Sequence, residues 1–305
     1  MSTPVIQIKQ LVRTFNTTDA VNGLDLTVQP GRCYGLFGRN GAGKTTTIKC
    51  LLDLLKPTGG KVELFGMNPA KHEVATRSRL AYVPDQLGFY PWMSALDHFQ
   101  HLASFRKLWN LQLQTDLLDQ FHLDPNQNIN SMSKGQKMQV ALIGALCPEP
   151  ELLILDEPTS GLDPLIRREF IRTVIGAYQD ADPENRTVFV STHLITEFEG
   201  LIDEFTIMDQ GRGLVTMQTD EARAQYKRVV AVFRETQEAP DLPGIMDCQI
   251  EGREMELWVE GDETPIRNWA EQLGCESLET HAMTLEEIFL TIVKQKEKQH
   301  AATAH

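Results

Sequence analysis

Cysteine is scarce in this sequence of 305 residues, and the five cysteines are not arranged as a site. Their number is odd, and no two have the Cys-x-x-Cys spacing of zinc and redox motifs. The sequence therefore predicts neither a disulfide framework nor a zinc site, and we expect all the thiols to be buried. The cysteines are Cys33, Cys50, Cys147, Cys248 and Cys275.

Long hydrophobic runs are absent as well. A membrane-spanning helix needs about eighteen consecutive apolar residues, and no window of this length is apolar throughout. Residues 1–9 lack a basic stretch followed by an apolar core, so we expect no signal peptide. With 41% hydrophobic residues, the chain has the composition of a soluble protein of one large or two ordinary domains. We expect it to be cytoplasmic.

Positive charge is in deficit, because the formal net charge is −13. Non-specific binding to nucleic acid depends on clustered lysine and arginine side chains. We therefore expect no nucleic-acid partner.

A glycine-rich octapeptide at residues 38–45 is the strongest motif that is present. Its order, Gly-Arg-Asn-Gly-Ala-Gly-Lys-Thr, fits the phosphate loop, in which backbone N–H groups surround a phosphate and glycines leave room for it. Lys44 is then expected to reach the β- and γ-phosphates, and the Thr45 hydroxyl to meet Mg²⁺. The following helix would direct its positive dipole end at the phosphates.

The sequence around the octapeptide supports this interpretation. Residues 32–37 form a short apolar run after a turn and predict a buried strand. Apolar residues at helical spacing follow, and residues 57–60, Pro-Thr-Gly-Gly, end the predicted helix. The order of strand, loop and helix is the one that a phosphate loop requires.

A second apolar run, at residues 152–155, ends in Asp156 and Glu157. It predicts a buried parallel strand that brings both carboxylates to the edge of the sheet where the phosphate loop lies. Asp156 would hold Mg²⁺, and Glu157 would orient and polarise the attacking water. Alone, the pair would also fit an ordinary strand end with solvated acids.

Three further segments follow a fixed order around this strand. Ser133 precedes a segment with helical periodicity and is expected to cap it. Residues 160–163, Ser-Gly-Leu-Asp, come directly after the acidic pair, and residues 187–191 predict another strand, which leads to His193.

In this order the motifs resemble the nucleotide-binding subunit of ATP-binding cassette (ABC) transporters over residues 4 to about 215. The resemblance implies an α/β fold: a phosphate-loop NTPase core with an antiparallel β subdomain and a helical subdomain at about residues 87–147. It also implies ATP and Mg²⁺ as ligands and head-to-tail pairing with a second ABC subunit, most simply a homodimer. A small α+β domain at residues 216–305 is expected to serve dimerisation or regulation.

The resemblance assigns roles to individual residues. The catalytic residues are Glu157, His193 and Lys44, and the metal ligands are Thr45 and Asp156. In trans, the segment Ser133, Lys134, Gly135 and Gln136 would close over the γ-phosphate of the other subunit, and Asp163 would lie in the loop that crosses the interface. The expected ATP-binding residues are Phe15, which would stack on adenine, and Gly38, Arg39, Asn40, Gly41, Ala42, Gly43, Lys44, Thr45 and Thr46.

Two positions depart from the family pattern. A glutamine that touches Mg²⁺ is expected after Tyr-x-Pro, but Pro84 is followed by Asp85 and then by Gln86, so either residue can hold that position. Lys134 stands where the family has glycine. A cation in the first turn opposes the helix dipole by a few tenths to about 1 kcal/mol. We hypothesise that Lys134 and Arg39 instead neutralise ATP in the closed dimer.

Aromatic residues are dense at residues 87–109, within the expected helical subdomain. An apolar groove is where the resemblance places a cytoplasmic helix of a separate transmembrane permease. Our candidates for this docking surface are Phe89, Tyr90, Trp92 and Met93, although part of this set would also serve the subdomain's own core. Ser94 is expected to cap the next helix, with Asp97 in its first turn.

The C-terminal third predicts strands at residues 229–233 and 254–259, a helix near residues 266–273 and a last helix from Thr284. Residues 284–287, Thr-Leu-Glu-Glu, form a capping box. This ending resembles exporter-type cassettes of the ABC-2 class. We therefore expect an ATPase subunit of an exporter, peripheral on the inner face of the cell membrane. A nucleotide-sensing module with low turnover and a soluble ABC ATPase without a transport role are the alternatives.

Overall fold

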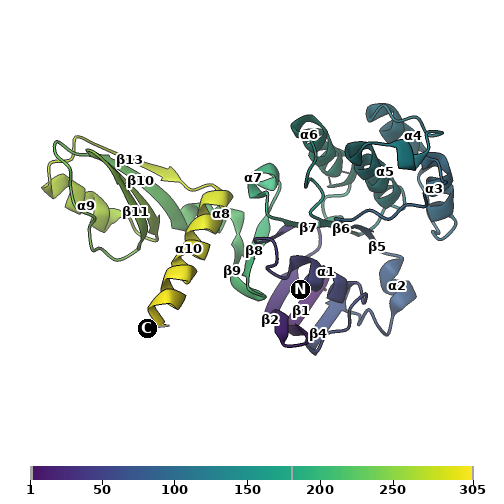
Figure 1. Ribbon diagram of the computed structural model, residues 1–305, viewed down its shortest axis with the longest axis horizontal. Helices are drawn as coiled ribbons and strands as arrows, with labels where there is room; N and C mark the ends of the chain where they lie inside the picture. Colours follow the sequence, from purple (N-terminus) through teal and green to yellow (C-terminus); the bar gives the residue numbers. More distant parts are fainter. Residues whose placement is uncertain (1–2, 180, 304–305) are drawn as a thin grey trace. The chain divides into compact units, whose positions relative to one another are not determined.

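The computed structural model of the protein describes residues 3–179 and 181–303. The chain divides into two compact units, Met1–Thr216 and Met217–His305 (Figure 1). Within the described residues, no helix combines the length and the apolar composition needed to span a bilayer.

A six-stranded sheet of order β5-β6-β7-β3-β8-β9 forms the centre of the first unit. β3 (Cys33–Phe37) lies between β7 (Thr187–Thr192) and β8 (Glu204–Asp209), parallel to both. Every residue of β3, β6 and β7 is buried, as expected for parallel strands covered on both faces. The other strands are β5 (Leu80–Val83), β6 (Leu152–Asp156) and β9 (Arg212–Gln218).

A three-stranded antiparallel sheet of order β2-β1-β4 completes the core of this unit. Its strands are β1 (Ile6–Phe15), β2 (Thr18–Val28) and β4 (Gly59–Leu64). Helix α1 (Lys44–Leu51) packs against both sheets, and its Ile48 and Leu51 are fully buried in the shared hydrophobic cluster. The helix that follows the phosphate loop is therefore held by the core on both sides.

Three helices are grouped beside β5, namely α3 (Ala95–Ala103), α4 (Leu111–Gln120) and α5 (Lys134–Leu146) (Figure 1). The predicted caps are confirmed, because Ser94 with Asp97 and Ser133 with Gln136 each form a complete capping box. The remaining helical segments of the first unit are α2 (Glu73–Arg77), α6 (Pro164–Thr173), α7 (Ile195–Phe198), the 3-10 turn η1 (Ile129–Ser131) and the π-helix η2 (Val174–Gln179).

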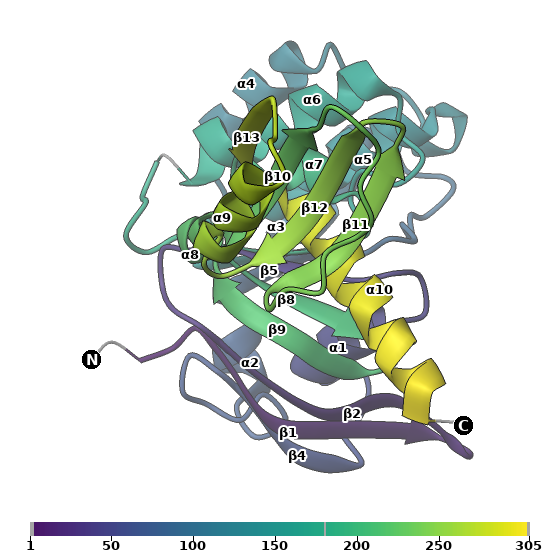
Figure 2. The same cartoon turned by 90° about the vertical axis from the view of Figure 1, so that its left-hand side faces the viewer.

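The second unit contains a four-stranded antiparallel sheet of order β11-β12-β10-β13. Helix α9 covers one face of this sheet, with Ile266 and Ala270 in a cluster with Val229 and Leu257 (Figure 2). The capping box at Thr284 is confirmed, since Thr284 and Glu287 exchange hydrogen bonds. The elements are α8 (Thr219–Gln225), β10 (Tyr226–Val232), β11 (Ile245–Glu251), β12 (Glu254–Glu260), α9 (Thr264–Gln272), β13 (Ser277–Ala282) and α10 (Leu285–Thr303).

The cysteines correct one expectation. All five are free thiols, but only Cys33, Cys50 and Cys147 are buried. Cys248 and Cys275 are half-buried, so the prediction of five buried thiols is wrong for these two. Both lie in the second unit, where the smaller sheet shields its residues less completely.

Candidate functional site

The phosphate loop turns sharply between β3 and α1. Gly43 precedes α1 with φ of 106°, and a Cβ atom there would lie 2.3 Å from the carbonyl oxygen of Ala20. A Cβ at Gly38 would likewise lie 2.6 Å from the Met208 carbonyl oxygen. Glycine is required at both positions, at Gly43 also because side chains disfavour that φ. No side chain caps the first turn of α1, so its N–H groups remain available to an anion.

A pocket of about 200 Å³ opens over this loop. Gly41 lines it, and a Cβ atom on Gly41 would meet nothing within 4 Å, so it would project into free space. The glycines and threonines of the loop line it together with Lys44, which suits a phosphate chain, and the carboxylates of Asp85 and Glu157 share the pocket. The lining residues are Ala20, Asn40, Gly41, Ala42, Gly43, Lys44, Thr45, Thr46, Asp85 and Glu157.

Asp156 is fully buried at the end of β6. Its Oδ1 accepts hydrogen bonds from the Ser191 hydroxyl at 2.5 Å and the Thr45 hydroxyl at 3.1 Å, and its Oδ2 accepts one from Tyr82 at 3.4 Å. Burial raises the pKa of Asp156, the bonds from Ser191 and Thr45 lower it, and the charges of Glu157 and Asp85 raise it again. Carboxylate and hydroxyl oxygens side by side are the donors that Mg²⁺ prefers, so these residues fit that metal.

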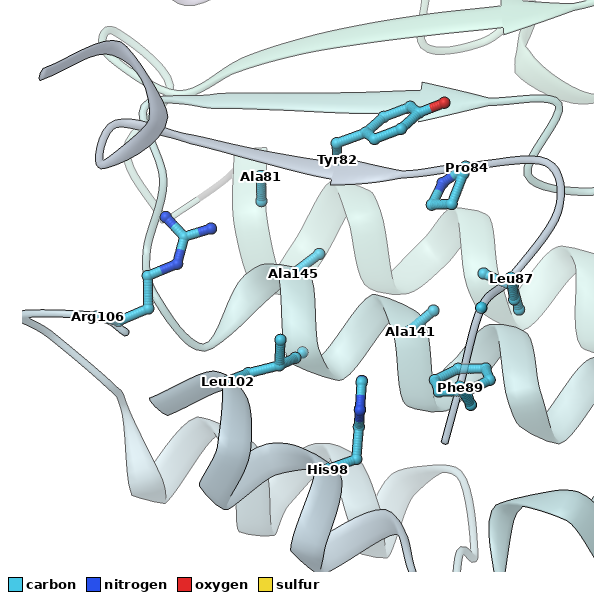
Figure 3. Close-up of a pocket in the computed structure, with 12 residues that line it drawn as sticks. Ala81, Tyr82, Pro84, Leu87, Phe89, His98, Leu102, Arg106, Ala141 and Ala145 are labelled. Carbon is cyan, nitrogen blue, oxygen red and sulfur yellow. The ribbon is translucent and has the colours of Figure 1, made fainter. Parts of the chain in front are cut away.

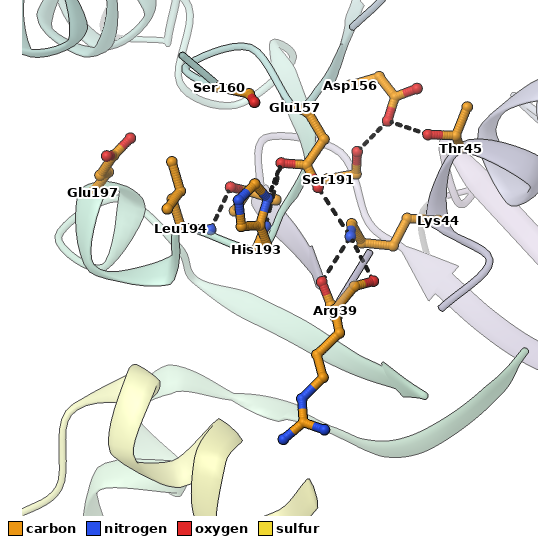
Figure 4. A network of polar contacts seen from close by, with 12 residues as sticks. Arg39, Lys44, Thr45, Asp156, Glu157, Ser160, Ser191, His193, Leu194 and Glu197 are labelled. Carbon is orange, nitrogen blue, oxygen red and sulfur yellow. Dashed lines mark hydrogen bonds and ion pairs between the residues drawn. The ribbon is translucent and has the colours of Figure 1, made fainter. Parts of the chain in front are cut away.

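Glu157, Lys44 and His193 form a continuous polar network (Figure 4). Glu157 Oε1 lies 2.9 Å from Lys44 Nζ, and its Oε2 lies 2.7 Å from His193 Nδ1. Lys44 Nζ also donates to the carbonyl oxygens of Gly38 at 2.7 Å and Arg39 at 3.2 Å. The three predicted catalytic side chains thus come together from the segments that follow three different strands, β3, β6 and β7.

The backbone helps to place Glu157. Its φ is 49°, a left-handed value that side chains rarely adopt, and its N–H donates to the carbonyl oxygen of Ser191 at 2.9 Å. Such local strain persists where the surroundings fix it and is frequent at functional sites. Directly after this bend, the carboxylate lies 2.9 Å from Lys44.

Of the two candidates after Pro84, Asp85 lines the pocket. Asp85 and Gln86 are both exposed, and Gln86 is not part of the pocket lining. The geometry therefore favours the register set by Pro84, with a carboxylate beside Asp156 where the family pattern has an amide.

Phe15 is 41% exposed, so it is not a core residue. The guanidinium of Arg13 lies 4.4 Å from the centre of its ring. An aromatic face with a cation on one side fits the predicted stacking on a base.

The segment at residues 133–136 opens α5. Ser133 and Gln136 cap the helix, while Gly135 is buried against Ile166, whose side chain would have to shift to admit a Cβ atom. The ammonium of Lys134 donates to the carbonyl oxygen of Ser160 at 2.5 Å. Lys134 thus contacts the loop after β6 in its own subunit.

Asp163 ends that loop and caps α6. Its Oδ1 accepts hydrogen bonds from the N–H groups of Leu165 and Ile166, both at 3.1 Å. The carboxylate therefore has a structural partner within the chain.

The candidate docking residues lie in the segment between β5 and α3. Tyr90 and Trp92 are 48% and 71% exposed, with ring centres 5.0 Å apart, while Phe89 and Met93 are half-buried. Figure 3 shows Phe89 beside a pocket of about 190 Å³ together with His98 and Leu102. A second groove of about 440 Å³, lined by residues that include Leu102 and Phe105, adjoins it.

Comparison with known proteins identifies the family. Residues 21–160 match the family described as ABC transporter. The bacitracin transport ATP-binding protein BcrA of Bacillus licheniformis is 34% identical over 230 residues, which cover 75% of this chain and 74% of that protein. The chain belongs to the ABC transporter ATP-binding subunits. The prediction of this family is confirmed.

Two further similarities agree with this assignment. The Nod factor export ATP-binding protein I of Cupriavidus metallidurans is 31% identical and covers 69% of this chain and 70% of its own length. A solved ATP-binding subunit of an ABC transporter superposes with a TM-score of 0.65 at 28% identity, covering 72% of this chain and 92% of that chain. The predicted fold class is confirmed, and the ABC subunit is an ATPase that binds ATP.

Several residues around the site were not predicted. Ser191 pairs in register with Asp156 across β6 and β7, and Tyr82 reaches the same carboxylate from β5. Their signal is position, since each lies on a parallel strand next to the acidic one. Arg167 and Glu197 have no such signal, because thirty residues separate them and only the fold brings them together.

Proposed function

We propose that this ABC ATPase subunit binds MgATP at the phosphate loop, pairs head to tail with a second copy and drives export through a separate membrane protein. The observation that carries the proposal is the meeting of Lys44, Glu157 and His193 at the pocket over the loop. Positioning and charge stabilisation are what phosphoryl transfer requires of a protein.

The residues would divide the work by their chemistry. Lys44 and His193 would hold the γ-phosphate, and Glu157 would take a proton from the attacking water as the bond from the γ-phosphorus to the bridging oxygen breaks. Thr45 and Asp156 would hold Mg²⁺, with Asp85 nearby and Gln86 as the alternative. Bound Mg²⁺ would neutralise charge that develops on the phosphate oxygens.

Glu157 has a second task before ATP binds. In this structure its carboxylate neutralises Lys44, which is only 5% exposed. A γ-phosphate at Lys44 would replace that carboxylate and release it to act on water. Binding and activation of the base are thereby one event.

The other half of each ATP site would come from Ser133, Lys134, Gly135 and Gln136 of the second subunit. The contact of Lys134 with the Ser160 carbonyl oxygen is exposed, so it is easily exchanged for a phosphate oxygen. Lys134 and Arg39 would then neutralise ATP together. Unchanged ATP affinity and turnover in Lys134→Ala would sink this role for Lys134.

The membrane partner would dock at Phe89, Tyr90, Trp92 and Met93. Exposed Tyr90 and Trp92 beside two apolar hollows are the features that an incoming amphipathic helix needs. The subunit would then be cytoplasmic and peripheral on the inner face of the membrane. The bacitracin transport and Nod factor export proteins among its relatives favour export as the direction. Residues 216–305 would support the dimer or regulate it.

Glu157→Gln tests the paired ATPase directly. The amide keeps the shape of the site but cannot accept the proton, so a dimer should accumulate with ATP on a sizing column while turnover falls at least about 100-fold. Glu151→Gln, at an exposed position just before the same strand, is the matched control and should remain monomeric under turnover. If Glu157→Gln elutes as a monomer with saturating ATP, head-to-tail pairing is wrong.

Docking has its own test. Trp92→Asp should reduce the fraction of subunit that sediments with membranes of cells that produce the partner, because a charge would enter an apolar interface. Leu54→Asp, at another exposed apolar position, is the control. Equal sedimentation of both variants would remove this surface from the proposal.

A further inference from the structure

The loop at residues 160–163 is held by an arginine that lies outside it. Arg167, on α6, donates from Nη2 to the carbonyl oxygen of Leu162 at 2.9 Å. Its Nη1 forms an ion pair with Glu197 on α7. One guanidinium therefore joins a backbone atom of the loop to a second helix.

Glu197 depends on this contact. Its side chain is only 13% exposed, and its second oxygen, Oε2, is buried without a hydrogen-bond partner. A buried carboxylate that loses its cation is strongly unfavourable, so Arg167 holds α7 in place. A planar guanidinium can serve two acceptors at fixed angles, which a lysine ammonium on a flexible stem does less well.

α7 begins two residues after His193. The imidazole Nδ1 of His193 lies 2.7 Å from Glu157 Oε2, and the backbone N–H of Leu194 donates to the Thr192 hydroxyl at 2.9 Å. His193 is thus placed between a fixed strand end and the helix that carries Glu197. Figure 4 shows Leu194 between His193 and Glu197, with Glu197 on the helix that follows the histidine.

We propose that Arg167 is a positioning residue, which ties the loop at Leu162 to Glu197 and thereby sets His193 against Glu157 and the γ-phosphate. This proposal rests on the proposed ATPase mechanism. When the loop moves, the guanidinium moves with it, and the position of the histidine changes. The arginine itself touches neither ATP nor water.

The test is a double-mutant cycle on the whole chain. Arg167→Ala and Glu197→Gln should each lower kcat for ATP by about 10- to 100-fold, because small displacements of reacting groups have effects of this size. KM should stay within about twofold of the parent value, since Lys44 and the rest of the phosphate loop are unchanged. The double variant should be no slower than the slower single variant, because both changes break one connection. Arg167→Lys should recover part of kcat.

Arg168→Ala is the matched control, because Arg168 is the exposed neighbour on the same helix, and its kcat should stay within about twofold of the parent. Glu197→Gln keeps the side-chain shape and carries the test should Arg167→Ala fail to fold. Independent, multiplying losses in the double variant, or a rise in KM with kcat unchanged, would overturn the proposal. Absence of turnover in the parent chain would instead overturn the proposed function.

Discussion

The six-stranded sheet of the first unit and the four-stranded sheet of the second unit bring polar residues together in different ways. In the first unit, β3, β6 and β7 run parallel, so the segments after them all leave at one edge, and Lys44, Glu157 and His193 meet there. In the second unit the strands alternate in direction, and Lys298 on α10 ties its helix to the sheet through an ion pair with Asp247 at 3.0 Å. A parallel sheet brings reactive side chains together at one edge. In the antiparallel sheet, this ion pair instead holds a helix against the strands.

The largest expected effect separates the units by activity. Lys44→Ala removes the ammonium that lies 2.9 Å from Glu157 Oε1 and that would hold the γ-phosphate, so turnover should fall at least about 100-fold. Lys298→Ala, which breaks an ion pair in the second unit, should leave turnover within about twofold. Steady-state ATP hydrolysis measures both. Comparable losses of turnover in the two variants would show that ATP hydrolysis depends on both units to a similar extent.

The next effect separates them by stability. Leu257 is fully buried in β12, and Leu257→Ala should lower the free energy of unfolding of the second unit by about 2–5 kcal/mol. Urea unfolding followed by the fluorescence of Trp258 and Trp269 would report the change. The rate of ATP hydrolysis at a temperature where both units are folded should not change. A parallel loss of turnover would mean that the second unit supports catalysis directly.

The smallest effect concerns pH and the helical part of the first unit. Burial lowers the pKa of His98 from 6.5 to about 4, with a smaller contribution from the charge of His101. Between pH 6.5 and 4, His98 binds a proton in the unfolded chain but stays neutral in the folded chain. The free energy of unfolding is therefore unaffected by His98 above about pH 6.5 and decreases as the pH falls toward 4. With partial solvent screening, the loss is on the order of 1 kcal/mol.

His98→Leu isolates that contribution. The ring packs against Phe89 with centres 4.9 Å apart, and leucine keeps an apolar side chain in that place. The free energy of unfolding should vary less between pH 6.5 and 4 than in the parent chain, as measured by urea titrations at several pH values. If the free energy of unfolding varies with pH as steeply in His98→Leu as in the parent chain, the pH dependence comes from other groups.

The sequence predicts the features that depend on residue types close together in the chain. The phosphate loop and the caps at Ser94, Ser133 and Thr284 follow from residue types a few positions apart, and the structure contains each of them. The family resemblance supplied the pairing of distant motifs. Roles for individual residues, Asp163 among them, remain predictions.

What the sequence did not predict depends on geometry over longer distances. The choice between Asp85 and Gln86 turns on one residue of register after Pro84, which no spacing rule decides. β13 has no alternation of apolar and polar residues strong enough to predict a strand, and it is held by pairing with β10. The link from Arg167 to Glu197 exists only once α6 and α7 are adjacent.

The ion pair between Lys44 and Glu157 has a consequence for ligand selection. A small anion that arrives at the loop meets a lysine whose charge is already matched by a carboxylate and two carbonyl oxygens. Free inorganic phosphate would have few other contacts to offset the loss of that carboxylate. ATP also gains from its base and its other phosphates. Under the proposed function, the resting ion pair would therefore favour ATP over free phosphate.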